Sequence, residues 1–117
     1  MLNTREALMG TGNHTEPLRS RFAGDAEMVE LVHEFVQELP QRVQALQGLM
    51  RASHFEELRR AAHQLKGAAG GYGFPSISES ASHVEKLLHA GVGQAEIADL
   101  QSRVDELAKL CGRAVAA

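Results

Sequence analysis

Apolar residues recur every three or four positions along most of the 117-residue chain, which is the spacing of one face of an α-helix. β-branched residues nowhere alternate with polar ones in the two-residue period of strands. The pattern predicts four amphipathic helices joined by short turns, over about residues 25–50, 53–70, 75–90 and 94–111. Such a series is typical of an all-α, antiparallel up-and-down four-helix bundle.

The inward faces of these helices are expected to supply the core. In chain order they carry Val29, Val32, Val36, Leu39, Val43, Leu46 and Met50; Phe55, Leu58, Ala62, Leu65, Ala69 and Tyr72; Ile77, Ala81, Val84, Leu87 and Leu88; and Ile97, Leu100, Val104, Leu107 and Cys111.

Capping residues and breakers set the expected helix ends. Asp25 and Ser53 are expected N-caps, because their side-chain oxygens can accept free backbone N–H groups. Pro40 lies inside the first helix and is expected to kink or divide it, since proline removes one backbone hydrogen bond. The glycine-rich run 70–73 is expected to end the second helix in a left-handed cap.

Residues 1–24 lack a helical period, and glycines and a proline interrupt them. We expect either a tail or a short extra N-terminal helix, beginning near Pro17, that places Leu18 and Phe22 on the core. Residues 25–117 then form the bundle as a single domain, which suits a chain of this length.

Composition narrows the class of partner and the compartment. A formal net charge of −3 without a basic block argues against nucleic acid as the main partner. Cys111 is the single cysteine, so no internal disulfide is possible and a reducing compartment is favoured. The sequence shows neither a secretory signal nor the ~18–20 apolar residues of a membrane span. We therefore expect a cytoplasmic protein without a membrane partner.

His63 lies on the polar side of the second predicted helix. At about 100° per residue, it is about 130° from the apolar stripe, so it faces water or a partner. Within about 60° of it on the same face are Arg59, Arg60, Lys66, Gly67 and Gly70. The local charge is therefore expected to be positive, and a mid-helix glycine, which costs about 1 kcal/mol relative to alanine, leaves room for close approach.

These residue types suit phosphoryl transfer through a phosphohistidine. An exposed neutral imidazole can attack an acyl phosphate without a separate general base, and Lys66 can stabilise the phosphoryl oxygens. The sequence has no GxxxxGK[ST] loop and no room for an ATP-binding kinase domain. We therefore expect a phosphoryl carrier and not an enzyme, with another protein supplying and receiving the group.

The segment His63-Gln64-Leu65-Lys66-Gly67-Ala68-Ala69-Gly70-Gly71-Tyr72-Gly73-Phe74 resembles the signature of histidine-containing phosphotransfer (HPt) domains. In that signature H-x-L-K-G is followed by small residues and by a glycine ten positions after the histidine, where Gly73 stands. Residues 58–62 and 35–40 are also similar to the family, as is the helix after Pro75, which includes Glu85. The likeness covers about residues 25–110.

The resemblance implies a monomeric bundle of four or five helices that relays phosphate between aspartates of response-regulator receiver domains, or from a hybrid histidine kinase. It implies that His63 is phosphorylated on Nε2, that Lys66 contacts the phosphate, and that Gly67 permits docking of a receiver. Arg59, Arg60, Gln64 and Gly70 are further candidate partner contacts. The chain itself would bind no cofactor or metal, and Mg²⁺ would come from the acidic pocket of the receiver.

Two alternatives of other classes remain open. One is a non-catalytic helical adaptor that binds receiver domains without carrying phosphate. The other is a metal-binding bundle, because Glu30 and His33 form one E-x-x-H step, whereas di-iron bundles need two. Glu79 and His83 are four residues apart, which is the wrong offset. Labelling with an acyl phosphate donor would separate these interpretations from the relay.

Overall fold

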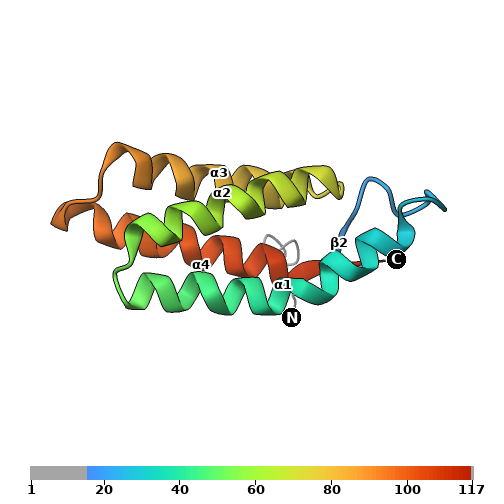
Figure 1. The fold of residues 1–117 in the computed structure, drawn as a ribbon, viewed down its shortest axis with the longest axis horizontal. Helices are drawn as coiled ribbons and strands as arrows, with labels where there is room; N and C mark the ends of the chain where they lie inside the picture. Colours follow the sequence, from blue (N-terminus) through green and yellow to red (C-terminus); the bar gives the residue numbers. More distant parts are fainter. Residues whose placement is uncertain (1–15, 117) are drawn as a thin grey trace, which may run out of the picture.

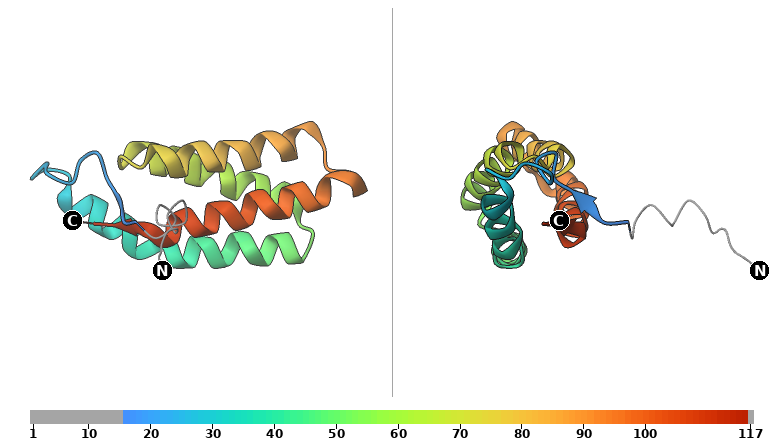
Figure 2. Two further views of the ribbon diagram at one scale, coloured as in Figure 1. Left: turned by 180° about the vertical axis from the view of Figure 1, so that it is seen from behind. Right: turned by 90° about the vertical axis from the view of Figure 1, so that its right-hand side faces the viewer.

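The computed structural model describes residues 16–116 as a bundle of four helices: α1 (Val29–Arg51), α2 (Phe55–Gly71), α3 (Pro75–Ala90) and α4 (Ile97–Arg113). A short 3₁₀ turn, η2 (Gln94–Glu96), leads into α4. Each helix packs against the next and α4 returns to α1, so the four lie in a ring (Figures 1 and 2). The predicted all-α four-helix bundle is confirmed. In this part of the chain no helix is both long and apolar enough to cross a membrane.

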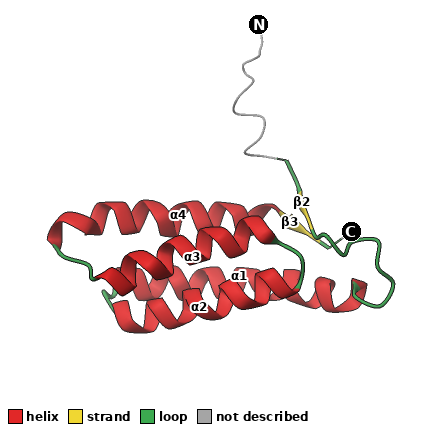
Figure 3. Cartoon of the chain, turned by 90° about the horizontal axis from the view of Figure 1, so that it is seen from above, coloured by secondary structure: helices red, strands yellow, loops and turns green. Residues whose placement is uncertain are grey.

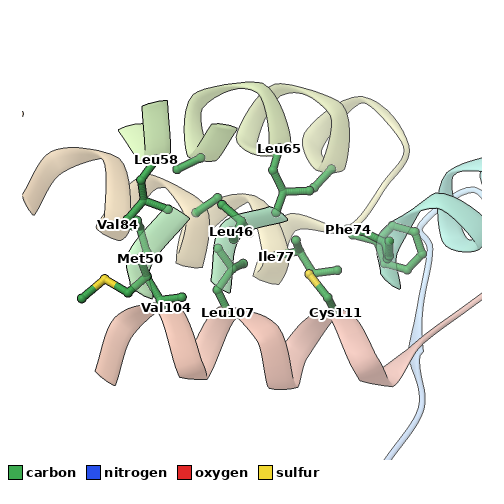
Figure 4. Packing of buried hydrophobic residues seen from close by; sticks show 14 of the residues in the cluster. Leu46, Met50, Leu58, Leu65, Phe74, Ile77, Val84, Val104, Leu107 and Cys111 are labelled. Carbon is green, nitrogen blue, oxygen red and sulfur yellow. The ribbon is translucent and has the colours of Figure 1, made fainter. Parts of the chain in front are cut away.

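The core lies along the bundle axis, where side chains from all four helices meet (Figure 4). Most predicted inward positions are buried. Val29 is an exception and is 38% exposed, because the first turns of α1 extend beyond the ends of α2 and α3 (Figures 1 and 3). Cys111 is buried on α4, and this burial raises the pKa of its thiol to about 12.

The segment before α1 differs from the prediction of a short extra helix. From residue 16 onward it holds a two-residue strand, β2 (Leu18–Arg19), followed by turns, and β2 pairs in parallel with β3 (Ala114–Val115). The backbone of β2 therefore bonds to the segment that follows α4, and the turns after β2 bond within the arm. Leu18 and Phe22 still pack against the core, as expected. The tail expected before residue 16 lies outside the described residues.

Asp25 does not cap α1 directly. Its carbonyl oxygen accepts hydrogen bonds from the N–H groups of Met28 and Val29, each at 3.0 Å, and its Oδ1 accepts one from Glu27 N–H at 2.9 Å. Asp25 thus organises a separate turn, and α1 begins four residues later at Val29. The predicted capping chemistry is present, but it serves the turn.

Ser53 was expected as the N-cap of α2, and this prediction is wrong. Its φ of +59° is left-handed, and its N–H donates to the Met50 carbonyl at 3.1 Å. The next N–H, of His54, donates to the Leu49 carbonyl at 3.0 Å. These two bonds form the closing pattern of a helix C-terminus, so Ser53 ends α1, and α2 begins at Phe55 after an N-cap of His54.

Pro40 bends α1 without dividing it. The helix is continuous from Val29 to Arg51 although Pro40 lacks the N–H that would bond one turn back. In Figure 1 the cyan first part of α1 is inclined to the green remainder. Of the two predicted outcomes, the kink is the one that the structure shows.

Gly73 closes α2 and joins it to the N-terminal arm. Its φ is +86°, and the next N–H, of Phe74, donates to the Ala69 carbonyl at 2.8 Å in the predicted left-handed cap. Ser20 Oγ donates to the Tyr72 carbonyl at 2.6 Å, and Arg21 N–H donates to the Gly73 carbonyl at 2.8 Å. A Cβ at Gly73 would lie 2.6 Å from Ser20 Oγ and 2.9 Å from Arg21 N. Only glycine fits this turn.

We predict that Gly73→Ala lowers the free energy of unfolding by about 2 kcal/mol or more, because a left-handed residue with a Cβ is strained and the arm must also move. Urea unfolding followed by circular dichroism measures the change. Gly71→Ala is the matched control: a Cβ there meets no atom within 4 Å, so stability should not fall. Equal unfolding midpoints for Gly73→Ala and wild type would contradict the role of the turn.

Candidate functional site

His63 lies in the middle of α2, and 62% of its side-chain surface is exposed. The core residues Ala62 and Leu65 stand on the other side of the same helix and are buried. The orientation predicted from the helical period is therefore confirmed. An imidazole in this position is open to another protein.

Glu85 of α3 holds both His63 and Lys66. Its Oε2 lies 2.7 Å from His63 Nδ1, and its Oε1 lies 2.8 Å from Lys66 Nζ. The two α2 residues are one turn apart on one face, so a single carboxylate can reach both. The Glu85 side chain is only 16% exposed. The helical period of α2 alone does not find Glu85; only the family resemblance includes it.

The protonation of this cluster follows from its contacts. The hydrogen bond from Lys66 lowers the pKa of Glu85, and the one from His63 lowers it further, while burial opposes both. Glu85 is therefore an ionised carboxylate, which can only accept hydrogen bonds. The proton between the two side chains belongs to His63 Nδ1, and in the neutral ring the lone pair is on Nε2.

Ser78 fixes the register between α2 and α3. Its Oγ donates to the Lys66 carbonyl at 2.8 Å, and Glu85 follows two turns later on the same helix. A Cβ on Gly70 would lie 3.4 Å from Ser78 Oγ. Gly70 is exposed, as expected for a partner contact, and it also lies beside α3. Its lack of a side chain favours helix packing.

The surface around His63 carries less positive charge in the structure than the sequence predicts. Arg59 forms an ion pair with Glu56 one turn earlier, and Arg60 Nε lies 3.6 Å from the same carboxylate. Lys66 is paired with Glu85. The three cations near His63 thus contact two carboxylates, Glu56 and Glu85, so the positive charge is smaller than predicted because these acidic partners were not included.

Gly67 and Gln64 lie on the side of α2 that faces α1. A Cβ on Gly67 would meet no atom within 4 Å, so the space predicted in front of this residue exists. Gly67 lines a groove that α1 closes on its other side with Leu31 and Glu34. Gln64 is exposed and lines a smaller hollow next to Arg42 of α1. Neither residue contacts His63 through a hydrogen bond in the described part of the chain.

The residues considered for metal binding are dispersed. Between residues 16 and 116 no three His, Cys, Asp or Glu side chains are grouped so that they could hold a metal ion. His33 Nε2 lies 3.1 Å from Gln37 Nε2, and His83 Nδ1 lies 3.4 Å from Arg103 Nη1. Neither histidine is joined to a carboxylate in the way a bundle metal site requires.

Comparison with protein families settles the class of the chain. A family model described as "Hpt domain" matches residues 30–117, which include His63, Lys66 and Glu85. The chain belongs to the Hpt domain family. No curated protein and no solved structure matches it significantly. As an Hpt domain the chain has a phosphotransfer role in two-component signalling, in which such domains are phosphocarrier modules that interact with receiver domains and kinases.

We predict that Glu85 stabilises this Hpt domain near neutral pH and that this stabilisation is lost in acid. Because its pKa in the folded state lies below the unfolded value near 4.5, its stabilising effect is complete above that pH and is lost as the pH falls through the folded pKa. The difference in urea midpoint between wild type and Glu85→Gln should be largest near neutral pH and shrink below about pH 4.5. Glu79→Gln, an exposed change on the same helix, is the control. A difference that stays constant with pH would contradict the assignment.

Proposed function

We propose that this Hpt domain carries a phosphoryl group on Nε2 of His63 and relays it between aspartates of receiver domains, or from a hybrid histidine kinase. The observation that carries the proposal is the state of the imidazole. Its Nδ1 lies 2.7 Å from a carboxylate oxygen of Glu85, while 62% of the side chain is exposed. Because an ionised carboxylate only accepts hydrogen bonds, Nδ1 carries the proton, and the lone pair of the neutral ring is on Nε2. A nucleophile so presented is accessible to an acyl phosphate on another protein.

The step can be followed atom by atom. Nε2 attacks the phosphorus of an aspartyl phosphate, the new N–P bond forms as the bond to the aspartyl oxygen breaks, and the aspartate leaves as a carboxylate. The ring becomes a phosphoimidazolium that keeps its proton on Nδ1. No general base is needed, and the reverse step releases the neutral imidazole.

Glu85 and Lys66 act on the charges that this step creates. The carboxylate 2.7 Å from Nδ1 stabilises the positive charge that develops on the ring. Lys66 is anchored through Nζ to the same carboxylate, one turn from His63, and is proposed to stabilise the phosphoryl oxygens. These contacts increase the rate of transfer both to and from His63, because the two directions share one transition state.

The partner is proposed to supply the metal ion. Phosphoryl transfer to and from an aspartate uses Mg²⁺ to balance the charge of the phosphoryl oxygens. The described residues of this chain offer no group of ligands for such an ion. We therefore place Mg²⁺ in the acidic pocket of the receiver. Separately, we expect the Hpt domain to act as a monomer.

We predict that His63→Gln abolishes phosphorylation and leaves the fold intact, since an exposed side chain contributes little to packing. Wild type and variant are incubated with a panel of phosphorylated receiver domains and Mg²⁺, and intact-mass spectrometry records the acid-labile gain of one phosphate. His83→Gln, on α3, should be labelled like wild type. Phosphate on His63→Gln would place the site elsewhere. No labelling of folded wild type by any receiver would favour a non-catalytic adaptor.

We predict that Lys66→Ala slows transfer from a receiver by roughly tenfold without preventing it, because one charged contact to the phosphoryl group is lost. Stopped samples analysed over time give the rate constant. Lys86→Ala, which removes an exposed cation from α3, controls for the change in net charge. A rate equal to wild type would remove Lys66 from the mechanism.

A further inference from the structure

A groove of about 470 Å³ separates α1 from α2 on the side of His63 that faces α1. The rings of Phe35 and Tyr72, whose centroids are 5.0 Å apart, give it an apolar lining. Gly67 and Gly71 of α2 add no side chains, so the groove reaches the turn next to His63 without obstruction. None of the proposed phosphoryl chemistry uses this space.

The α1 edge of the groove is acidic and partly apolar. Glu34 and Glu38 lie four residues apart on one face, a spacing at which like charges destabilise a helix. Arg42 Nη2 lies 3.4 Å from Glu38, but between residues 16 and 116 no hydrogen bond or ion pair holds Glu34. Leu31, one turn before, is 43% exposed and is among the few large apolar side chains left in water. Arg42 therefore supplies this edge with one cation, at Glu38, while Glu34 has no cation among the described residues and Leu31 is left partly uncovered.

We propose that Glu34 and Glu38, on the α1 edge of this groove, select receivers that present an apolar side chain flanked by lysine or arginine. The apolar group would pack on Leu31 and on the exposed part of Tyr72, and the cations would pair with Glu34 and, beside Arg42, with Glu38. Receivers with an acidic surface at this position would be rejected by like-charge repulsion. The inference rests on the proposed relay function of His63.

Position favours a receiver over other occupants. Gly67 both lines the groove and stands one turn from His63, so a protein seated in the groove is brought against the imidazole. A partner that must deliver an acyl phosphate to His63 needs such a contact beside the site of transfer. The groove is therefore continuous with the surface at which the reaction is proposed to occur.

The test uses the receiver that phosphorylates wild type fastest, and phosphoramidate as a small donor that needs no docking surface. For each variant the rate of phosphate uptake from the receiver is divided by the rate from phosphoramidate. Glu34→Lys/Glu38→Lys should lower this ratio at least about tenfold. The matched control, Asp105→Lys/Glu106→Lys, makes the same charge change on exposed residues of α4, which do not line the groove, and should keep the wild-type ratio.

Salt gives a second readout. Uptake from the receiver should fall for wild type as NaCl rises from about 50 to about 500 mM, because screening weakens exposed charge pairs. The doubly substituted variant should lose this dependence. A wild-type rate that does not change with salt would overturn selection by charge.

Steric blocking tests the groove without altering its charge. Gly67→Leu projects a side chain into open space and should also lower the ratio at least about tenfold, whereas Gly112→Leu, in an equally open position on α4, should not. Circular dichroism and urea unfolding establish that each variant is folded.

The outcomes separate the two proposals. Unchanged ratios in the Glu34/Glu38 and Gly67 variants, with wild type still phosphorylated by receivers, overturn the docking site alone. Uptake from phosphoramidate but from no receiver overturns the relay function as well. A wild-type dimer in sedimentation that Glu34→Lys/Glu38→Lys converts to monomer would assign the groove to a second copy of the chain, and would overturn the inference.

Discussion

The site depends on one shared carboxylate. Glu85 reaches from α3 to an imidazole and an ammonium on α2, and it decides which nitrogen of His63 keeps its proton and where Lys66 is held. Such a contact exists only while α2 and α3 keep their register. Ser78 fixes that register through the Lys66 carbonyl, and the turn at Gly73 fixes where α3 begins. The arm that packs on Gly73 through Ser20 therefore supports the site from a distance.

The helices and their inward faces could be predicted from the sequence because periodicity is local information. Their ends were less predictable. Asp25 and Ser53 are good capping residues, but the same side chains also favour turns, and which role they adopt depends on where the neighbouring helix closes. The pairing of Leu18 with Ala114 joins distant parts of the chain and has no local signal. The sequence therefore predicted either a tail or a short helix here, and not a strand.

The residues of the site also differ in how far the sequence predicts them. His63, Lys66 and Gly67 share one helical face, so a single period places them together. Glu85 belongs to another helix, where it borders the apolar stripe, and nothing within α3 indicates which side chains it will meet. The pairing of Glu56 with Arg59 and Arg60 had a sequence signal, because these residues are three and four positions apart. Counting cations without these partners made the face too positive.

The exposure of His63 also affects how long a phosphoryl group would remain on its ring. Within the described residues no cleft encloses the imidazole, and Glu85, the nearby carboxylate, is already occupied by Lys66 and by the ring itself. Neither shielding from water nor a free base to activate a water molecule is provided. The lifetime of a phosphohistidine here would thus be set by the intrinsic hydrolysis of its N–P bond. The frequency of encounters with partners would have to exceed that rate, so the concentration of receivers, more than the protein's own shape, would determine how long a signal is stored.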